Sequence, residues 1–65
     1  MNADVFKGKW KQARGRAKQA WSDLTDDDLA RIDGSYDRLI GTLQEKYGYT
    51  KAEAEAKIDA EFGDD

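Results

Sequence analysis

The sequence predicts an all-α protein, a small four-helix bundle built from two pseudo-repeated α-hairpins in a single domain over residues 1–65. Apolar side chains recur at the three-four spacing of a helix face. The segment that begins with Gly8-Lys9-Trp10 also resembles the segment that begins with Gly34-Ser35-Tyr36, as an internal repeat would. Such a duplication implies two helical hairpins that cover each other's apolar faces, because neither alone buries enough surface to fold.

The first half of the chain predicts a long helix and a short one. The long helix is expected over residues 3–20, with Asn2 or Asp4 as its cap. Its apolar face carries Phe6, Trp10, Ala13, Ala17, Trp21 and Leu24. The short helix is expected over residues 26–32, where Thr25 caps the free amides and Asp28 completes a capping box. It ends before Asp33-Gly34.

The second half predicts two more helices with clear end signals. One is expected over residues 35–47, followed by Gly48 as the left-handed residue that ends it. The other is expected over residues 51–62, where Thr50 and Glu53 form a second capping box and Gly63 closes the helix.

The expected core consists of the large apolar side chains on the predicted inner faces. These are Phe6, Trp10, Trp21, Leu24, Leu29, Ile32, Tyr36, Leu39, Ile40, Leu43, Tyr47 and Ile58. No cysteine or histidine is present to supply a disulfide or a zinc site, so packing must hold the chain together.

Glycines inside the predicted helices need an explanation, because an exposed helical glycine costs about 0.5–1 kcal/mol relative to alanine. Gly8 and Gly15 lie opposite the apolar face of the first helix, and Gly41 lies opposite that of the third. They indicate either close helix approach on a second face, or tolerance of a loosely held helix, or positions under no packing demand.

The composition argues against catalysis. The chain lacks a histidine base and a cysteine nucleophile, and neither Ser22 nor Ser35 has the glycine-elbow context of a nucleophile. Asp26, Asp27 and Asp28 lie in a first helical turn, where carboxylates stabilise the helix dipole, and they lack calcium-loop spacing. We therefore expect no catalytic residue, no metal, no cofactor and no small-molecule substrate.

Charge is distributed unevenly along the chain. The stretch from Val5 to Ala20 contains no acidic residue and carries all the cations of the first predicted helix. The whole chain nevertheless has a net charge of −3. These cations are Lys7, Lys9, Lys11, Arg14, Arg16 and Lys18. They flank the aromatic stripe on both sides, so the helix could contact nucleic acid or an anionic membrane surface. The alternative is that the stripe is core and the cations are solvated or paired with acidic helices.

Several segments together resemble the CsbD-like family of small bacterial general-stress proteins. The resemblance extends from about Lys7 to Glu55. It is carried by Gly8-Lys9-Trp10-Lys11-Gln12, Gly15-Arg16-Ala17-Lys18, Trp21, Leu24-Thr25-Asp26-Asp27-Asp28-Leu29, Ile32-Asp33-Gly34, Leu39-Ile40-Gly41, Gln44-Glu45-Lys46-Tyr47-Gly48 and Ala54-Glu55. The chain departs from the usual pattern at Ser22 and Thr42. The resemblance implies a bundle of two crossed hairpins and expression under general stress, but no catalytic residues.

Two functions of different classes follow. The first is a non-enzymatic hydrophilic protectant that acts by abundance, because 38% of residues are charged and the mean hydropathy is low. The alternative is a small binding module that uses the basic first helix. A cytoplasmic location is expected, because no apolar run approaches the roughly 20 residues of a membrane span and no signal-peptide order is present.

Overall fold

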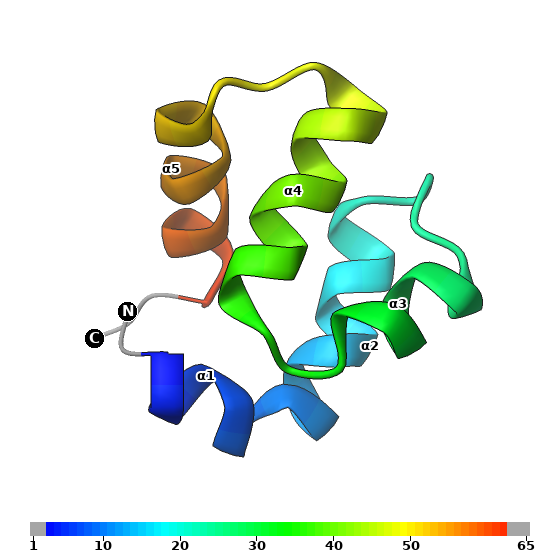
Figure 1. Ribbon diagram of the computed structural model, residues 1–65. Helices are drawn as coiled ribbons and strands as arrows, with labels where there is room; N and C mark the ends of the chain where they lie inside the picture. The colour runs from blue at the N-terminus through cyan, green and yellow to red at the C-terminus, as the bar shows by residue number, and fades with distance from the viewer. Residues whose placement is uncertain (1–2, 63–65) are drawn as a thin grey trace.

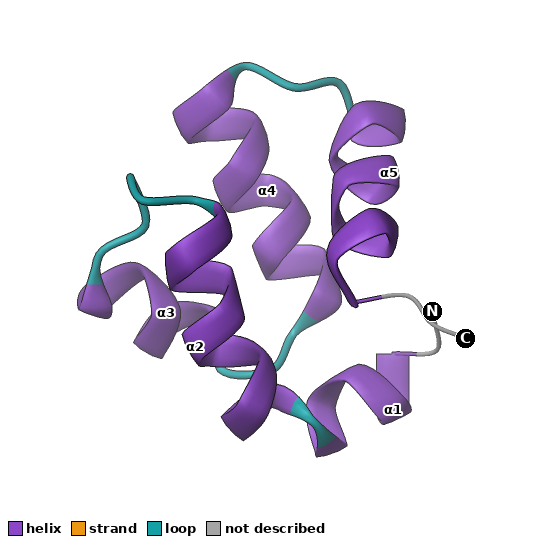
Figure 2. Cartoon of the chain, turned by 180° about the vertical axis from the view of Figure 1, so that it is seen from behind, coloured by secondary structure: helices purple, strands orange, loops and turns teal. Residues whose placement is uncertain are grey.

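The computed structural model describes residues 3–62, and every regular element in that range is a helix. The helices are α1 (Ala3–Gly8), α2 (Trp10–Ala20), α3 (Asp26–Ile32), α4 (Tyr36–Tyr47) and α5 (Lys51–Phe62). Helix α4 packs against α1, α3 and α5, and α2 contacts α1 and α5 (Figures 1 and 2). The all-α prediction is confirmed. Asn2 and Gly63, expected at the two ends of the bundle, lie outside the described residues.

The expected continuous helix over residues 3–20 is wrong, because the chain bends at Lys9. Lys9 takes φ −100° and ψ 5° and has no side-chain cap. Its N–H is shared between the carbonyl oxygens of Val5 and Phe6, at 3.0 and 3.2 Å. The bend turns α1 away from the axis of α2, as Figure 2 shows, and α1 packs against α4. Gly8, just before the bend, is a poor helix former and offers little resistance to it.

The two segments of the internal sequence repeat both begin at helix boundaries. Trp10 and Tyr36 are the first residues of α2 and α4, and Lys9 and Ser35 are the N-caps that precede them. The two halves nevertheless differ, because three helices precede α4 while the second half holds α4 and α5 alone among the described residues. The bundle of two equivalent crossed hairpins is not confirmed.

The helix ends follow the predicted signals closely. Thr25 Oγ1 accepts from Asp28 N at 3.1 Å, and Asp28 Oδ2 accepts from Thr25 N at 2.9 Å. Thr50 and Glu53 repeat this exchange at 3.1 and 2.8 Å. Gly48 is left-handed, with φ 71°, and ends α4 as predicted. Both predicted capping boxes are therefore confirmed.

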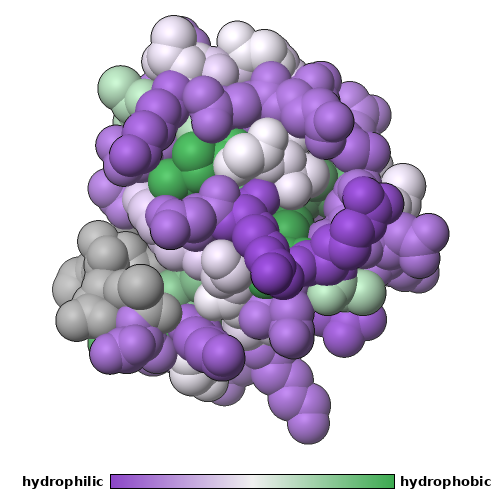
Figure 3. All heavy atoms as spheres, in the orientation of Figure 1, coloured by the Kyte–Doolittle hydropathy of each residue, from purple (hydrophilic) through white to green (hydrophobic). Residues whose placement is uncertain are grey.

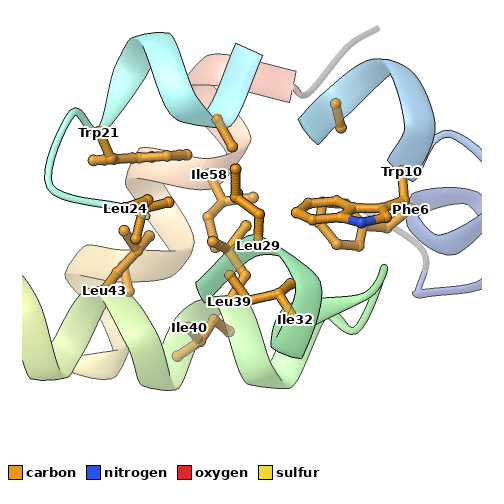
Figure 4. Close-up of a cluster of buried hydrophobic side chains, with 13 residues drawn as sticks. Phe6, Trp10, Trp21, Leu24, Leu29, Ile32, Leu39, Ile40, Leu43 and Ile58 are labelled. Carbon is orange, nitrogen blue, oxygen red and sulfur yellow. The ribbon is translucent and has the colours of Figure 1, made fainter. Parts of the chain in front are cut away.

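A single hydrophobic cluster fills the space between the helices. Figure 4 shows Trp21, Leu24 and Leu43 at one end of it and Phe6 with Trp10 at the other. All the expected core residues are buried except Tyr36 and Tyr47, which are only partly buried and pack against the cluster. Three small residues that the expected core did not include are also buried: Ala13, Ala17 and Ala54. They allow helices to approach closely where a larger side chain would hold them apart.

Gly15 and Gly41 are exposed inside α2 and α4, and a Cβ built at either position meets nothing within 4 Å. Close helix approach at these positions is therefore wrong. Gly15→Ala and Gly41→Ala are each expected to stabilise the protein by about 0.5–1 kcal/mol, because alanine restricts the unfolded chain without a clash. Urea unfolding of each variant measures the gain. A lower midpoint for either would show that its glycine has a role the packing does not reveal.

Candidate anion-binding surface

The six cations expected to meet an anionic partner all lie on the surface, but they do not share one environment. Lys7 belongs to α1 and Lys9 to the bend. The others, Lys11, Arg14, Arg16 and Lys18, belong to α2, and all six residues are exposed. Because of the bend at Lys9, they do not lie along one continuous helix as expected.

Arg16 and Lys18 contact other helices of the same chain. Arg16 Nη2 donates to the carbonyl oxygen of Glu61 at 2.6 Å, and its guanidinium lies 5.5 Å from the centroid of the Phe62 ring. Lys18 Nζ lies 2.7 Å from Asp26 Oδ1, and this hydrogen bond lowers the pKa of Asp26 from its ordinary value. These two cations tie α2 to α5 and to α3, so a partner would have to displace those contacts.

Lys7, Lys11 and Arg14 lie around one surface hollow, which we call the basic hollow. It has a volume of about 400 Å³ and lies between the bent α1–α2 segment and α3. Trp10 and Ala30 also line it, and Asp33 is the one acidic residue in its lining. Within residues 3–62, the three basic side chains make no ion pair or hydrogen bond. Half of the expected cations therefore lie around one concave surface.

The aromatic stripe that the cations flank faces inward. Phe6, Trp10 and Trp21 are 1%, 8% and 5% exposed, so their rings are core and not a contact surface. The Phe6 ring packs edge-on against Tyr36 and Phe62, with centroids 5.8 and 6.2 Å apart. Exposed rings that could insert into a membrane are consequently missing from this face.

A second charged cluster joins the start of α3 to the end of α4. Lys46 Nζ lies 2.6 Å from Asp28 Oδ2 and donates to the carbonyl oxygen of Asp23 at 3.2 Å. Tyr47 Oη accepts from the backbone N–H of Asp23 at 3.2 Å. Lys46 and Tyr47 thereby hold the loop between α2 and α3 against α4.

Asp28 is the only buried charged residue in the described part of the chain, at 8% exposed. The ammonium group of Lys46 and the backbone N–H of Thr25 donate to its carboxylate, and they hold its pKa at about 2, below the ordinary 3.8. Arg31 Nη2 adds a more distant contact at 3.8 Å. Asp28 is thus a buried anion whose charge is already compensated within the chain.

Residues 3–62 contain no cluster of three or more histidine, cysteine, aspartate or glutamate side chains arranged to hold a metal ion. Across the same range, no helix has the length and apolar character needed to cross a bilayer.

Comparison with known proteins shows to which family the chain is related. A family model described as CsbD-like matches residues 4–56. The chain belongs to the CsbD-like family. It is 55% identical over 58 residues to the UPF0337 protein PA4738 of Pseudomonas aeruginosa, an alignment that covers 89% of both chains. It is 48% identical over 58 residues to the UPF0337 protein YjbJ of Escherichia coli K12, covering 89% of this chain and 84% of that one. No solved structure matches significantly.

Some features of this CsbD-like chain were not predicted from its sequence. Asp28 was interpreted as a helix cap alone, and nothing in the sequence indicates that Lys46, in another helix, reaches it. The basic hollow was also missed, because part of its lining comes from α3. The bend at Lys9 was missed as well: Gly8 was the one available signal for it, and Gly8 was interpreted as an exposed position within a continuous helix.

The contacts of Asp28 make the stability of this CsbD-like chain sensitive to acid. A carboxyl group whose pKa is lowered on folding contributes stability that is complete above its unfolded value and lost as the pH falls through the folded value. The ordinary pKa of the carboxyl group is 3.8 and its pKa in the folded protein is about 2, so this stability is expected to be lost between about pH 4 and pH 2.

Asp28→Asn should flatten the pH dependence of the urea midpoint between about pH 4 and pH 2. Asp27→Asn is the matched control, because Asp27 is exposed in the same turn. Equal flattening in both variants would contradict the assignment to Asp28.

Proposed function

We propose that this CsbD-like protein is a non-enzymatic, cytoplasmic protein of the bacterial general stress response that protects other macromolecules by its abundance. Membership of the family supports the link to stress. The inward orientation of the aromatic stripe supports the mode of action, because it leaves little apolar surface for a specific partner on the described part of the chain. The proposal requires no catalytic residue, cofactor or small-molecule substrate.

The surface composition is the observation that carries the proposal. Val5, at 48% exposed, is the only large hydrophobic residue that is exposed in the described range. On the face drawn in Figure 3, hydrophobic atoms occupy small areas surrounded by hydrophilic ones. A mixed charged surface without apolar patches keeps a protein dispersed and hydrated at high concentration. Such a protein can separate other macromolecules as water is withdrawn.

The test is to change the order of the surface while keeping its composition. In the variant, exposed residues are exchanged among exposed helix positions, and the capping boxes, the Asp28 and Lys46 pair and all core side chains are retained. The core side chains to retain are Phe6, Trp10, Ala13, Ala17, Trp21, Leu24, Leu29, Ile32, Leu39, Ile40, Leu43, Ala54 and Ile58. A labile enzyme is dried with each protein, and its activity is measured after rehydration. Equal protection is expected, and a folded variant that fails to protect would contradict the proposal.

The binding module predicted as the alternative remains a second proposal. Lys7, Lys11 and Arg14 favour it, because they are exposed and make no ion pair or hydrogen bond in the described part of the chain. The engaged side chains of Arg16 and Lys18 and the buried aromatic rings weigh against a broad interface with nucleic acid or an anionic membrane. To test the binding module, tryptophan fluorescence is recorded while nucleic acid or anionic vesicles are added. A saturable change at physiological salt would support it, and a change at low salt alone would remove it.

A further inference from the structure

We propose that the basic hollow binds a short chain of linked phosphate groups, such as inorganic tripolyphosphate or the triphosphate of a nucleotide. This inference does not depend on the protectant function. It starts from the positions of Lys7 on α1 and of Lys11 and Arg14 on α2, which all lie at the rim of one concavity. Its volume of about 400 Å³ falls within the roughly 300–1,000 Å³ range of small-ligand sites.

The net positive charge of the basic hollow favours the binding of an anion. Three cations and one acid, Asp33, line it, and the cations make no ion pair or hydrogen bond within residues 3–62. Cations held around one concavity repel one another and attract a multivalent anion. Arg16 and Lys18, on the same helix, are engaged with other helices. The unpaired positive charge of α2 is therefore concentrated at the hollow.

The spacing of the cations favours several linked phosphates over one. Lys11 and Arg14 stand three residues apart on α2, about 4.5 Å along the helix axis at 1.5 Å per residue, and Lys7 lies across the bend on α1. One phosphate can meet one or two of these side chains, whereas a chain of linked phosphates can reach all three. Ammonium and guanidinium groups both form charge-assisted hydrogen bonds with phosphate oxygens. Gly8 and Ala30 present no long side chain that would block the hollow.

The surroundings argue against larger anions. A nucleic acid that continued along α2 beyond Arg14 would approach Asp26, which is exposed and already bonded to Lys18. A nucleobase would find no exposed ring for stacking at the hollow, because Trp10 is 8% exposed. A membrane would find Val5 as the one large exposed apolar side chain in the described range. Recognition should therefore depend on the phosphate chain.

The experiment titrates sodium tripolyphosphate into ¹⁵N-labelled protein at physiological salt and records amide chemical shifts. Saturable shifts are expected at Gly8, Trp10 and Ala30. The variant Lys11→Gln with Arg14→Gln should bind at least about tenfold more weakly, because it removes two charge-assisted contacts. The control, Lys51→Gln with Lys57→Gln, removes the same charge from exposed positions on α5, outside the hollow. It should bind within about twofold of the unaltered protein, because no contact is lost.

A second pair of variants uses single substitutions. Ala30→Glu places a carboxylate in the hollow and should also abolish the shifts, whereas Ala52→Glu, exposed on α5, should not. The nucleotide ATP should give the same saturable shifts as tripolyphosphate, and adenosine should give no shift.

Equal losses of affinity in the hollow and control variants, or no saturable shift with the unaltered protein, would overturn the proposal. Tighter binding of a short duplex would overturn it in favour of a nucleic-acid interface. Protection in the drying assay should be unchanged in the hollow variant, so each proposal can fail alone.

Discussion

Ile58→Ala is expected to destabilise the protein by about 2–5 kcal/mol, because it leaves a cavity in the middle of the core. Ile58 is 0% exposed on α5, and Figure 4 places it between the Trp21 end of the cluster and the Phe6 and Trp10 end. A single core in a chain of this size supplies roughly 3–5 kcal/mol in total. The variant should therefore be largely unfolded at room temperature, as measured by circular dichroism and urea titration.

Two further substitutions make the Ile58 result quantitative. Ile58→Val removes one methylene and should cost about 0.5–1.5 kcal/mol, which leaves the protein folded and measurable. Val5→Ala alters the large exposed apolar side chain on α1 and should change stability by less than about 0.5 kcal/mol. If Ile58→Val cost no more than Val5→Ala, α5 would not be docked on the core as described.

Gly34→Ala is expected to destabilise the protein by about 2–5 kcal/mol, through backbone strain and overpacking together. Gly34 follows α3 with φ 80°, a conformation that L side chains rarely adopt. A Cβ there would lie 3.2 Å from the Cβ of Trp10 and 3.3 Å from the Cα of Lys7. The Lys7 contact is with backbone, so α1 or the α3–α4 connection would have to move.

Gly48→Ala separates the two causes. Gly48 has nearly the same conformation, with φ 71°, but a Cβ there meets nothing within 4 Å. Its cost should be the strain alone, about 1–2 kcal/mol. The difference between the two urea-derived free energies then measures how closely α1 approaches the chain after α3. A smaller cost for Gly34→Ala than for Gly48→Ala would contradict that close approach.

Helix ends were predictable because the signals that set them are local. Thr25 and Thr50 each accept from the residue three positions on, and Gly48 adopts the conformation that glycine favours. Such contacts form within one turn of chain and depend little on the rest of the fold. The apolar spacing was similarly informative, because side chains three or four residues apart share a helix face.

The bend at Lys9 could not be predicted in the same way. Lys9 has no capping side chain, and its neighbours continue the apolar spacing of α2 on both sides. What favours the bend is tertiary, because it lets α1 pack against α4 and places Phe6 beside Tyr36. Contacts between residues so far apart in sequence leave no periodic signal.

The candidate site was predictable in composition but not in geometry. The acid-free stretch placed the six cations on one continuous helix, whereas the structure divides them between α1, the bend at Lys9 and α2. Which of them remain available was decided by partners from elsewhere: Glu61 and Phe62 for Arg16, and Asp26 for Lys18. The pairing of Asp28 with Lys46 likewise joins two helices. A single sequence carries no record of which helices become neighbours.

The measurement that most directly tests action by abundance is a titration of protection against the amount of protein. A labile enzyme is dried with increasing mass ratios of this chain, and the activity recovered after rehydration is recorded. Protection by a hydrated, non-specific surface should rise gradually with mass ratio and should continue well beyond equimolar amounts. A sharp plateau near one molecule of protein per enzyme would show a specific complex and contradict the account.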